Sequence, residues 1–115
     1  MRIAVTSDEL NVSTSLSRCA SYMCYTVDYG VITQCQNFPN PNLPPKPTAH
    51  LLQNLGVDLV LSNTIESNLE KELIDGGVEV IKGVTGTARG AVEHYLSELL
   101  SGHDELFAEE ENIAC

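Results

Sequence analysis

All five prolines of this 115-residue chain fall within residues 39–47, and this segment divides the sequence into two halves. A proline fixes φ near about −65° and lacks a backbone N–H, so a run of prolines cannot continue a helix interior or an inner strand. Residues 37–47 are therefore predicted to form an extended, stiff surface loop. Strand-like runs precede the loop, and apolar runs alternate with helical patterns after it.

The N-terminal half is predicted to form three strands. Residues 3–5 begin a short buried strand, and residues 7–17 form a polar loop with several hydroxyls. Residues 22–27 and 31–36 are rich in β-branched and aromatic side chains and are predicted to pair as a hairpin around a turn at residues 28–31.

The four cysteines show neither a CxxC pair nor a zinc spacing, and without a secretion signal a disulfide framework is not expected. If Tyr29 and Gly30 are the two loop residues of the hairpin, Cys24 lies opposite Cys35 as a hydrogen-bonded pair. That kind of pair has the wider Cα separation, so a disulfide is compatible with the register but not favoured. A three-residue loop would separate the two thiols.

The C-terminal half is predicted to be regular β/α. Helices are expected at residues 48–55, with Thr48 as N-cap, and from near Ser67, at the start of a capping-box pattern, to Asp75. Strands are expected at residues 57–61 and 78–81. A last helix begins after the N-cap Thr87, and its core stripe is Ala88, Val92, Tyr95, Leu96 and Leu99. The predicted fold class is α/β, with a mixed five-stranded sheet and helices on its faces.

Length and charge indicate one domain at residues 1–101, followed by an acidic, flexible tail at residues 102–115. The formal charge is −10, and the tail holds five acids with no lysine or arginine. Such a chain is not expected to bind nucleic acid, because duplex binding needs clustered lysine and arginine. No apolar stretch reaches the ~20 residues of a membrane span, so no membrane partner and a cytoplasmic location are expected.

Three predicted loops follow parallel strands at residues 6–8, 62–66 and 82–87 and should meet at one edge of the sheet. The last, Lys-Gly-Val-Thr-Gly-Thr, leads directly into a helix, so its backbone N–H groups and hydroxyls favour an anion. Glycine there lets the backbone approach a ligand. The candidate binding residues are Ser7, Asp8, Ser13, Arg18, Asn63, Lys82, Gly83, Thr85, Gly86 and Thr87.

On these residues the chain resembles the nitrogenase iron-molybdenum cofactor biosynthesis proteins and their small stand-alone relatives. The resemblance covers about residues 1–101 and is most specific at residues 82–87. It rests further on residues 1–8, 12–13, 56–58, 68–69 and 76–80, and on Arg18, Tyr22 and Asp28. It implies a three-layer α/β/α fold with a ribonuclease H-like motif.

The resemblance also implies a function, namely binding or carrying an anionic metal-sulfur cluster or its precursor. The cargo would be the iron-molybdenum cofactor or another molybdenum or iron-sulfur cluster, which can be missing from purified protein. A protein partner in cofactor assembly is implied as well. Where the family often has a His-Phe-Gly-Arg-like run, this chain has residues 15–18, Ser-Leu-Ser-Arg. Cys19, beside the cation of Arg18, is the candidate metal ligand in place of the missing histidine, or else a packed loop thiol.

Other functions fit the residues less well, and the protein is not expected to be an enzyme. Two-metal nuclease chemistry needs several carboxylates, and only Asp8 and Glu66 lie at predicted strand ends. The glycine turn lacks the Walker order, and no Gly-x-Ser-x-Gly elbow is present. The alternative that stays open is a small interaction module that docks a partner through the proline-rich loop or the acidic tail, without a cofactor.

Overall fold

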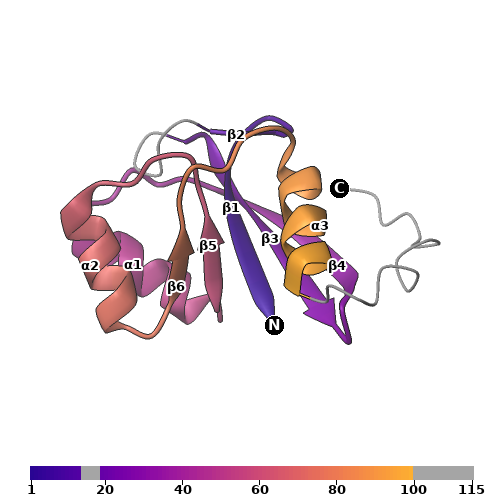
Figure 1. Ribbon diagram of the computed structural model, residues 1–115. Coiled ribbons are helices and arrows are strands. Elements are labelled where there is room, and N and C mark those ends of the chain that lie inside the picture. Colours follow the sequence, from indigo (N-terminus) through magenta and orange to yellow (C-terminus); the bar gives the residue numbers. More distant parts are fainter. Residues whose placement is uncertain (14–18, 100–115) are drawn as a thin grey trace.

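The computed structural model describes residues 1–13 and 19–99 (Figure 1). In chain order its elements are β1 (Arg2–Asp8), β2 (Asn11–Val12), β3 (Ser21–Asp28), β4 (Val31–Pro39), α1 (Pro45–Asn54), β5 (Leu59–Leu61), α2 (Ser67–Asp75), β6 (Glu79–Ile81) and α3 (Ala88–Leu99). Arg18 and the predicted tail at residues 102–115 lie outside the described residues. In the described part of the chain, no helix combines the length and apolar character needed to cross a membrane.

The strands form one mixed sheet in the order β4-β3-β1-β5-β6. β1, β5 and β6 are parallel, whereas β3 is antiparallel to both β1 and β4. The carboxyl ends of the three parallel strands therefore lie at the same edge. The expectation of five strands is wrong by one, because β2 pairs with the end of β1 and makes the sheet six-stranded. A strand of two residues is too short to show an alternating pattern in the sequence.

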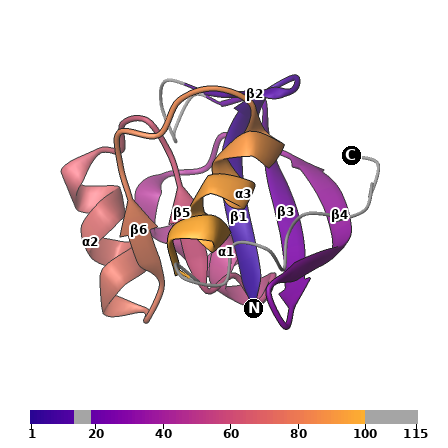
Figure 2. The same cartoon turned by 45° about the vertical axis from the view of Figure 1, so that its right-hand side comes forward.

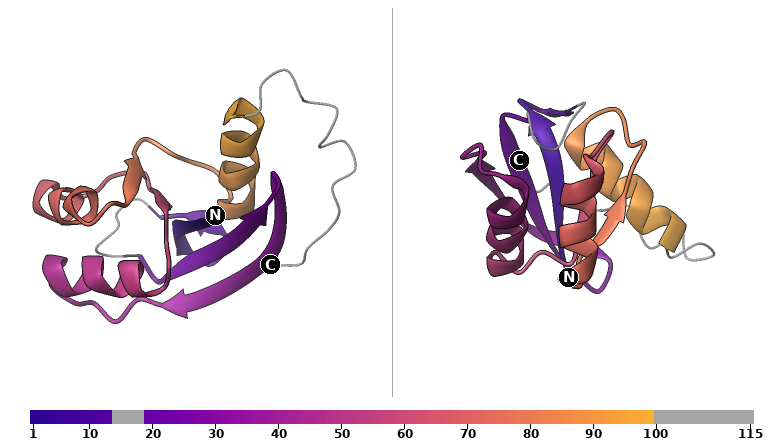
Figure 3. Two further views of the ribbon diagram at one scale, coloured as in Figure 1. Left: turned by 90° about the horizontal axis from the view of Figure 1, so that it is seen from below. Right: turned by 90° about the vertical axis from the view of Figure 1, so that its left-hand side faces the viewer.

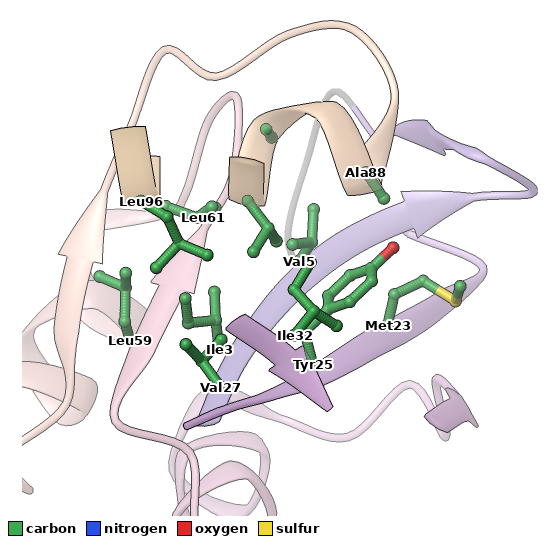
Figure 4. Packing of buried hydrophobic residues seen from close by; sticks show 12 residues of the cluster. Ile3, Val5, Met23, Tyr25, Val27, Ile32, Leu59, Leu61, Ala88 and Leu96 are labelled. Atoms are coloured by element: carbon green, nitrogen blue, oxygen red, sulfur yellow. The ribbon is translucent and has the colours of Figure 1, made fainter. Parts of the chain in front are cut away.

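Helices cover both faces of the sheet, which confirms the α/β fold class (Figure 3). On one face, alternate residues of the strands, such as Ile3 and Val5, pack in one cluster with Leu96 of α3 (Figure 4). Val92 of α3 belongs to the same cluster. On the other face, Ala4 and Val60 pack with residues of α1 and α2. Odd and even residues of β1 thus point into different cores, as the pleat of a strand requires. The ribonuclease H-like description stays an expectation from the resemblance.

The predicted stripe of α3 agrees with its burial. Ala88, Val92 and Leu96 are buried, and Tyr95 packs against the same core as a partly buried residue. The stripe also includes Ala91, which the sequence analysis did not assign to it. The side chain of Leu99 lies outside the described part of the structure.

The hairpin of β3 and β4 has the predicted turn but not the predicted register. Tyr29 and Gly30 both have positive φ, at 55° and 78°, and Asp28 lies opposite Val31. A register shift then occurs between Thr26 and Val27, so that Cys24 lies opposite Gln36 and Tyr25 lies opposite Cys35. The prediction that Cys24 faces Cys35 is wrong for this reason. Cys24 is a buried free thiol.

The proline-rich segment is shorter than predicted, because regular structure enters it from both sides. β4 continues to Pro39, and α1 begins at Pro45. The first N–H groups of a helix have no intrahelical acceptor, so prolines in the first turn of α1 cost it no hydrogen bond. Thr48 is therefore not the N-cap. Its N–H donates to Pro44 O at 3.0 Å, and its hydroxyl donates to Leu43 O at 3.0 Å.

α2 occupies the predicted residues but starts differently in detail. Its N-cap is Glu66 rather than Ser67, and no side chain makes a capping hydrogen bond. The helix ends at the predicted glycine pair, with Gly76 as C-cap and Gly77 at φ 89°.

Candidate functional site

The three segments that follow β1, β5 and β6 lie together at one edge of the sheet, as the sequence predicts. We call this the carboxyl edge and define it as residues 8–13, 62–66 and 82–88. Figure 2 shows the chain running from β6 across the top of the sheet to β2 before it enters α3. After β5 the chain turns to α2 on one face, and after β6 it turns to α3 on the other. Such a divergence of neighbouring connections is where open α/β sheets bind ligands.

The first and third segments are joined through their backbones. Val12 N–H donates to Gly86 O at 2.8 Å, and Ala88 N–H donates to Leu10 O at 2.9 Å. Asn11 and Thr87 lie opposite each other between these two bonds as an isolated antiparallel bridge. The turn between β1 and β2 therefore fixes the position of the glycine-rich segment at the start of α3.

The second and third segments are joined in the same way. Gly83 N–H donates to Asn63 O at 2.8 Å, and Val84 N–H donates to Ser62 O at 3.1 Å. The Asn63 side chain also donates from Nδ2 to Val84 O at 3.3 Å. One side-chain donor of Asn63, a predicted binding residue, is thus used to position the glycine-rich segment.

A pair of buried hydroxyls joins the first and second segments. Thr6 Oγ1 donates to Ser62 Oγ at 3.1 Å, and Ser62 Oγ donates to Thr64 O at 3.0 Å. Thr6 and Ser62 are fully buried. This link between the ends of β1 and β5 was not predicted from the sequence. A hydroxyl at the end of each apolar run was the signal that could have revealed it.

The glycine-rich segment carries unused donors. Among the described residues, none accepts a hydrogen bond from the backbone N–H of Thr85, Gly86 or Thr87, and all three residues are exposed. Gly83 and Gly86 have φ of 79° and 95°, and a β-carbon at either would meet no atom of residues 1–13 and 19–99 within 4 Å. The space beside these backbones is therefore open, as an approaching ligand requires.

Thr87 has the predicted capping role. Its Oγ1 accepts a hydrogen bond from Gly90 N–H at 3.0 Å, and its carbonyl accepts one from Ala91 N–H at 3.0 Å. The hydroxyl therefore satisfies one donor of the first turn of α3. The N-terminal end of α3, where the helix dipole is positive, lies at the carboxyl edge.

The two predicted serines and Asp8 take part in the local structure of this edge. Ser7 is buried, and its Oγ donates to Glu9 O at 2.6 Å. Ser13 is buried as well, and its N–H donates to Thr6 O at 2.8 Å. Asp8 Oδ1 accepts the Ala20 N–H at 2.8 Å. These contacts position the chain around β2, and a role of the three residues toward a ligand stays a prediction.

The formal charges at the carboxyl edge do not make it cationic. Lys82 Nζ lies 3.1 Å from Glu70 Oε1, so its charge is balanced within the protein. Three exposed carboxylates, those of Asp8, Glu9 and Glu66, belong to or flank the same segments. Among the described residues of this edge, attraction of an anion must therefore come from N–H groups and hydroxyls that touch it rather than from a long-range positive field.

Cys19 is buried and is held beside Asn40, another residue that the sequence analysis missed. Asn40 Nδ2 lies 2.9 Å from Cys19 O and 3.7 Å from its Sγ, and Asn40 Oδ1 accepts the hydroxyl of Tyr22 at 3.1 Å. Burial, with a smaller contribution from Asp8, raises the pKa of the Cys19 thiol to about 11. The thiol is therefore protonated at neutral pH, not the thiolate expected beside Arg18. A metal would have to displace this proton.

Nowhere in residues 1–13 and 19–99 do three or more His, Cys, Asp or Glu side chains gather so as to hold a metal ion. The described residues of the carboxyl edge thus supply hydrogen-bond donors rather than a set of metal ligands. They suit the outer atoms of an anion.

Comparison with known proteins points to one family. The sequence model of the family described as dinitrogenase iron-molybdenum cofactor matches residues 1–98. Among curated proteins, no significant match was found.

Solved structures share the fold at low sequence identity. The crystal structure of PH0822 superposes with a TM-score of 0.79 at 18% identity, over 85% of this chain and 92% of that one. A candidate dinitrogenase from Methanocaldococcus jannaschii gives a TM-score of 0.73 at 14% identity, over 88% and 92%. A candidate NifB protein from Thermotoga gives 0.66 at 20% identity, over 82% and 85%. The likeness to these chains extends over most of the described structure.

Proposed function

Because the chain belongs to the dinitrogenase iron-molybdenum cofactor family, we propose that it is a non-enzymatic binding or carrier protein for an anionic metal-sulfur cluster or a precursor of one. The observation that carries the proposal is the set of unused, exposed N–H groups of Thr85, Gly86 and Thr87 at the carboxyl edge. The description of the family supports this choice of cargo, and the unused donors support an anion site at the carboxyl edge.

The physical chemistry of the cargo fits these donors. Metal-sulfur clusters and thiometallates carry negative charge on their outer sulfur atoms, and these atoms accept hydrogen bonds. Successive backbone N–H groups and a helix N-terminus stabilise such charge without a formal cation. Gly83 and Gly86 have positive φ and no β-carbon, so a cluster or thiometallate can approach the backbone closely there.

The mode of binding that follows is a cradle around the cargo rather than a full coordination shell. The described residues offer Cys19 as the one predicted metal ligand, and that thiol must lose its proton before it can bind a metal. Contacts through outer sulfur atoms need no such step. A cargo that is bound only through its outer sulfur atoms can be released readily. The proposal therefore includes a protein partner in cofactor assembly that receives the cluster.

Anaerobic reconstitution tests the proposal. The purified protein is mixed with tetrathiomolybdate, or with molybdate, iron and sulfide, then desalted, and the retained chromophore and metal are measured. We expect about one molybdenum or one cluster per chain. A desalted protein with neither colour nor metal under all of these conditions would contradict the carrier function.

A further inference from the structure

The cation that lies three residues before the unused donors, Lys82, already has a carboxylate partner. Lys82 is the first residue after β6, and its Nζ lies 3.1 Å from Oε1 of Glu70, in the first turn of α2. The side chain of Lys82 is 52% exposed and that of Glu70 is 23% exposed. The pair therefore lies at the surface where α2 meets the end of β6.

The backbone of Lys82 is fixed even though its side chain is not. The next residue, Gly83, donates its N–H to Asn63 O at 2.8 Å, which ties this point of the chain to the segment after β5. From there a flexible four-carbon stem carries the ammonium. An ion pair this exposed is weak enough for a ligand of higher charge to break, so the ammonium can leave Glu70 for an anion that carries more charge than one carboxylate.

The other cation near the start of α3 is also paired. Arg89 Nε lies 3.0 Å from Glu93 Oε2, within the same helix. Within the described residues, a ligand that arrives at Thr85–Thr87 therefore meets hydrogen-bond donors, and each of the two cations near it already has a carboxylate partner. Only a ligand with enough charge can compete with Glu70 for Lys82.

We propose that Glu70 sets the affinity and the charge selectivity of the carboxyl edge by holding the Lys82 ammonium away from the bound anion. This inference rests on the proposed function and specifies the class of cargo. A multiply charged anion draws Lys82 from Glu70, whereas a singly charged anion of the same shape does not. Glu70 is a positioning residue that acts through Lys82, because it belongs to α2 rather than to the segments with unused donors.

The test compares two substitutions that change the net charge equally. Glu70→Gln removes the carboxylate beside Lys82 and keeps the shape of the side chain. The matched control is Glu98→Gln, which removes a carboxylate from the exposed pair of Glu98 with His94, near the end of α3. Affinity for tetrathiomolybdate is measured without oxygen for wild type and both variants, and thermal unfolding confirms that each is folded.

We expect Glu70→Gln to bind tetrathiomolybdate about fivefold more tightly, the effect of one unit charge at short range in a partly exposed site. Glu98→Gln should bind as wild type does. In a Lys82→Met background most of the gain from Glu70→Gln should disappear. Charge selectivity is measured by displacing the bound tetrathiomolybdate with molybdate or with perrhenate. Both anions are tetrahedral, but molybdate carries two negative charges and perrhenate carries one. Molybdate should displace it better, and Glu70→Gln should enlarge the difference.

The outcomes separate this inference from the proposed function. If wild type binds the probe and Glu70→Gln binds it no more tightly than Glu98→Gln, the role of Glu70 is refuted and the carrier function stands. Weaker binding by Glu70→Gln, or an undiminished gain in the Lys82→Met background, also refutes it. If neither wild type nor any variant binds the probe, both proposals fail.

Discussion

Gly86 and Gly77 share one backbone requirement, and they lie after and before β6 in the sequence. Their φ values are 95° and 89°, and a β-carbon on either would meet nothing within 4 Å in the part of the chain that the structure describes. Replacement by alanine should therefore act through backbone strain rather than through steric overlap, with a cost of about 1–2 kcal/mol at each position. The two glycines differ in place, because Gly86 lies at the carboxyl edge and Gly77 precedes β6.

We predict that Gly86→Ala and Gly77→Ala lower the free energy of unfolding by similar amounts, whereas only Gly86→Ala weakens tetrathiomolybdate binding, by about fivefold or more. Strain at Gly86 turns the neighbouring N–H groups away from the ligand. Urea unfolding and anaerobic titration of the two variants measure these effects. Equal affinity in both variants would show that the glycine-rich segment does not contact the anion.

Two buried thiols contribute to the dependence of stability on alkaline pH. Burial raises the pKa of both Cys19 and Cys24 from 9.0 to about 11. The folded state then holds these protons more tightly than the unfolded state does. The stability that this difference provides is fully present below pH 9 and is lost as the pH rises toward 11.

We therefore predict that the free energy of unfolding falls between pH 9 and pH 11, by up to about 1.4 kcal/mol per pH unit for each thiol. Urea unfolding at several pH values measures this slope. Cys24→Ala removes one thiol and should make the slope shallower, although the variant is less stable at every pH. Stability that stays level or increases over this range would contradict the environment described for the two thiols.

At the scale of elements, the ends of β1 and β5 are joined by the Thr6 and Ser62 hydroxyls. Both side chains are fully buried, and Thr6 Oγ1 lies 3.1 Å from Ser62 Oγ. Removal of one hydroxyl leaves the other without this partner, and an unsatisfied buried group costs about 1–3 kcal/mol. Removal of both leaves no such mismatch between them.

We predict that Thr6→Val and Ser62→Ala each lower the free energy of unfolding by about 1–3 kcal/mol, and that the double variant loses less than the sum by about 1 kcal/mol. A double-mutant cycle from urea unfolding measures the coupling. Strict additivity would mean that the two hydroxyls do not stabilise each other.

The elements that the sequence predicted well are those with a periodic apolar pattern. β5, α2, β6 and α3 each lie at or within a residue or two of the expected position, because one buried stripe or run defines each of them. The edge at which their connections meet also follows from this order of strands and helices. Residues 82–87 could be placed there for that reason.

The features that the sequence did not predict depend on contacts between distant residues or on single positions. β2 exists because Asn11 and Val12 pair with the end of β1, which no local pattern indicates. The hairpin register shifts at Thr33, whose hydroxyl lies 3.3 Å from Thr26 O and 3.2 Å from Asp28 Oδ2. The pairing of Lys82 with Glu70 likewise depends on how α2 packs beside β6.

At the scale of the whole molecule, the sheet has two structurally different ends. The carboxyl edge gathers three connections and the start of α3 (Figure 1). The opposite end holds the N-terminus, whose ammonium donates to Val27 O at 3.0 Å, and the turn at Tyr29 and Gly30. Because the two ends are joined by the same rigid strands, a ligand at one end should leave the backbone of the other end unchanged.

The most direct test of the account is a titration of the 15N-labelled protein with tetrathiomolybdate, without oxygen, followed through its backbone amide resonances. We predict that the amides of Thr85, Gly86 and Thr87 shift most and that those of Tyr29 and Gly30 stay in place. Unchanged resonances at residues 85–87, with shifts elsewhere or none, would contradict the claim that this edge of the sheet binds an anionic cargo.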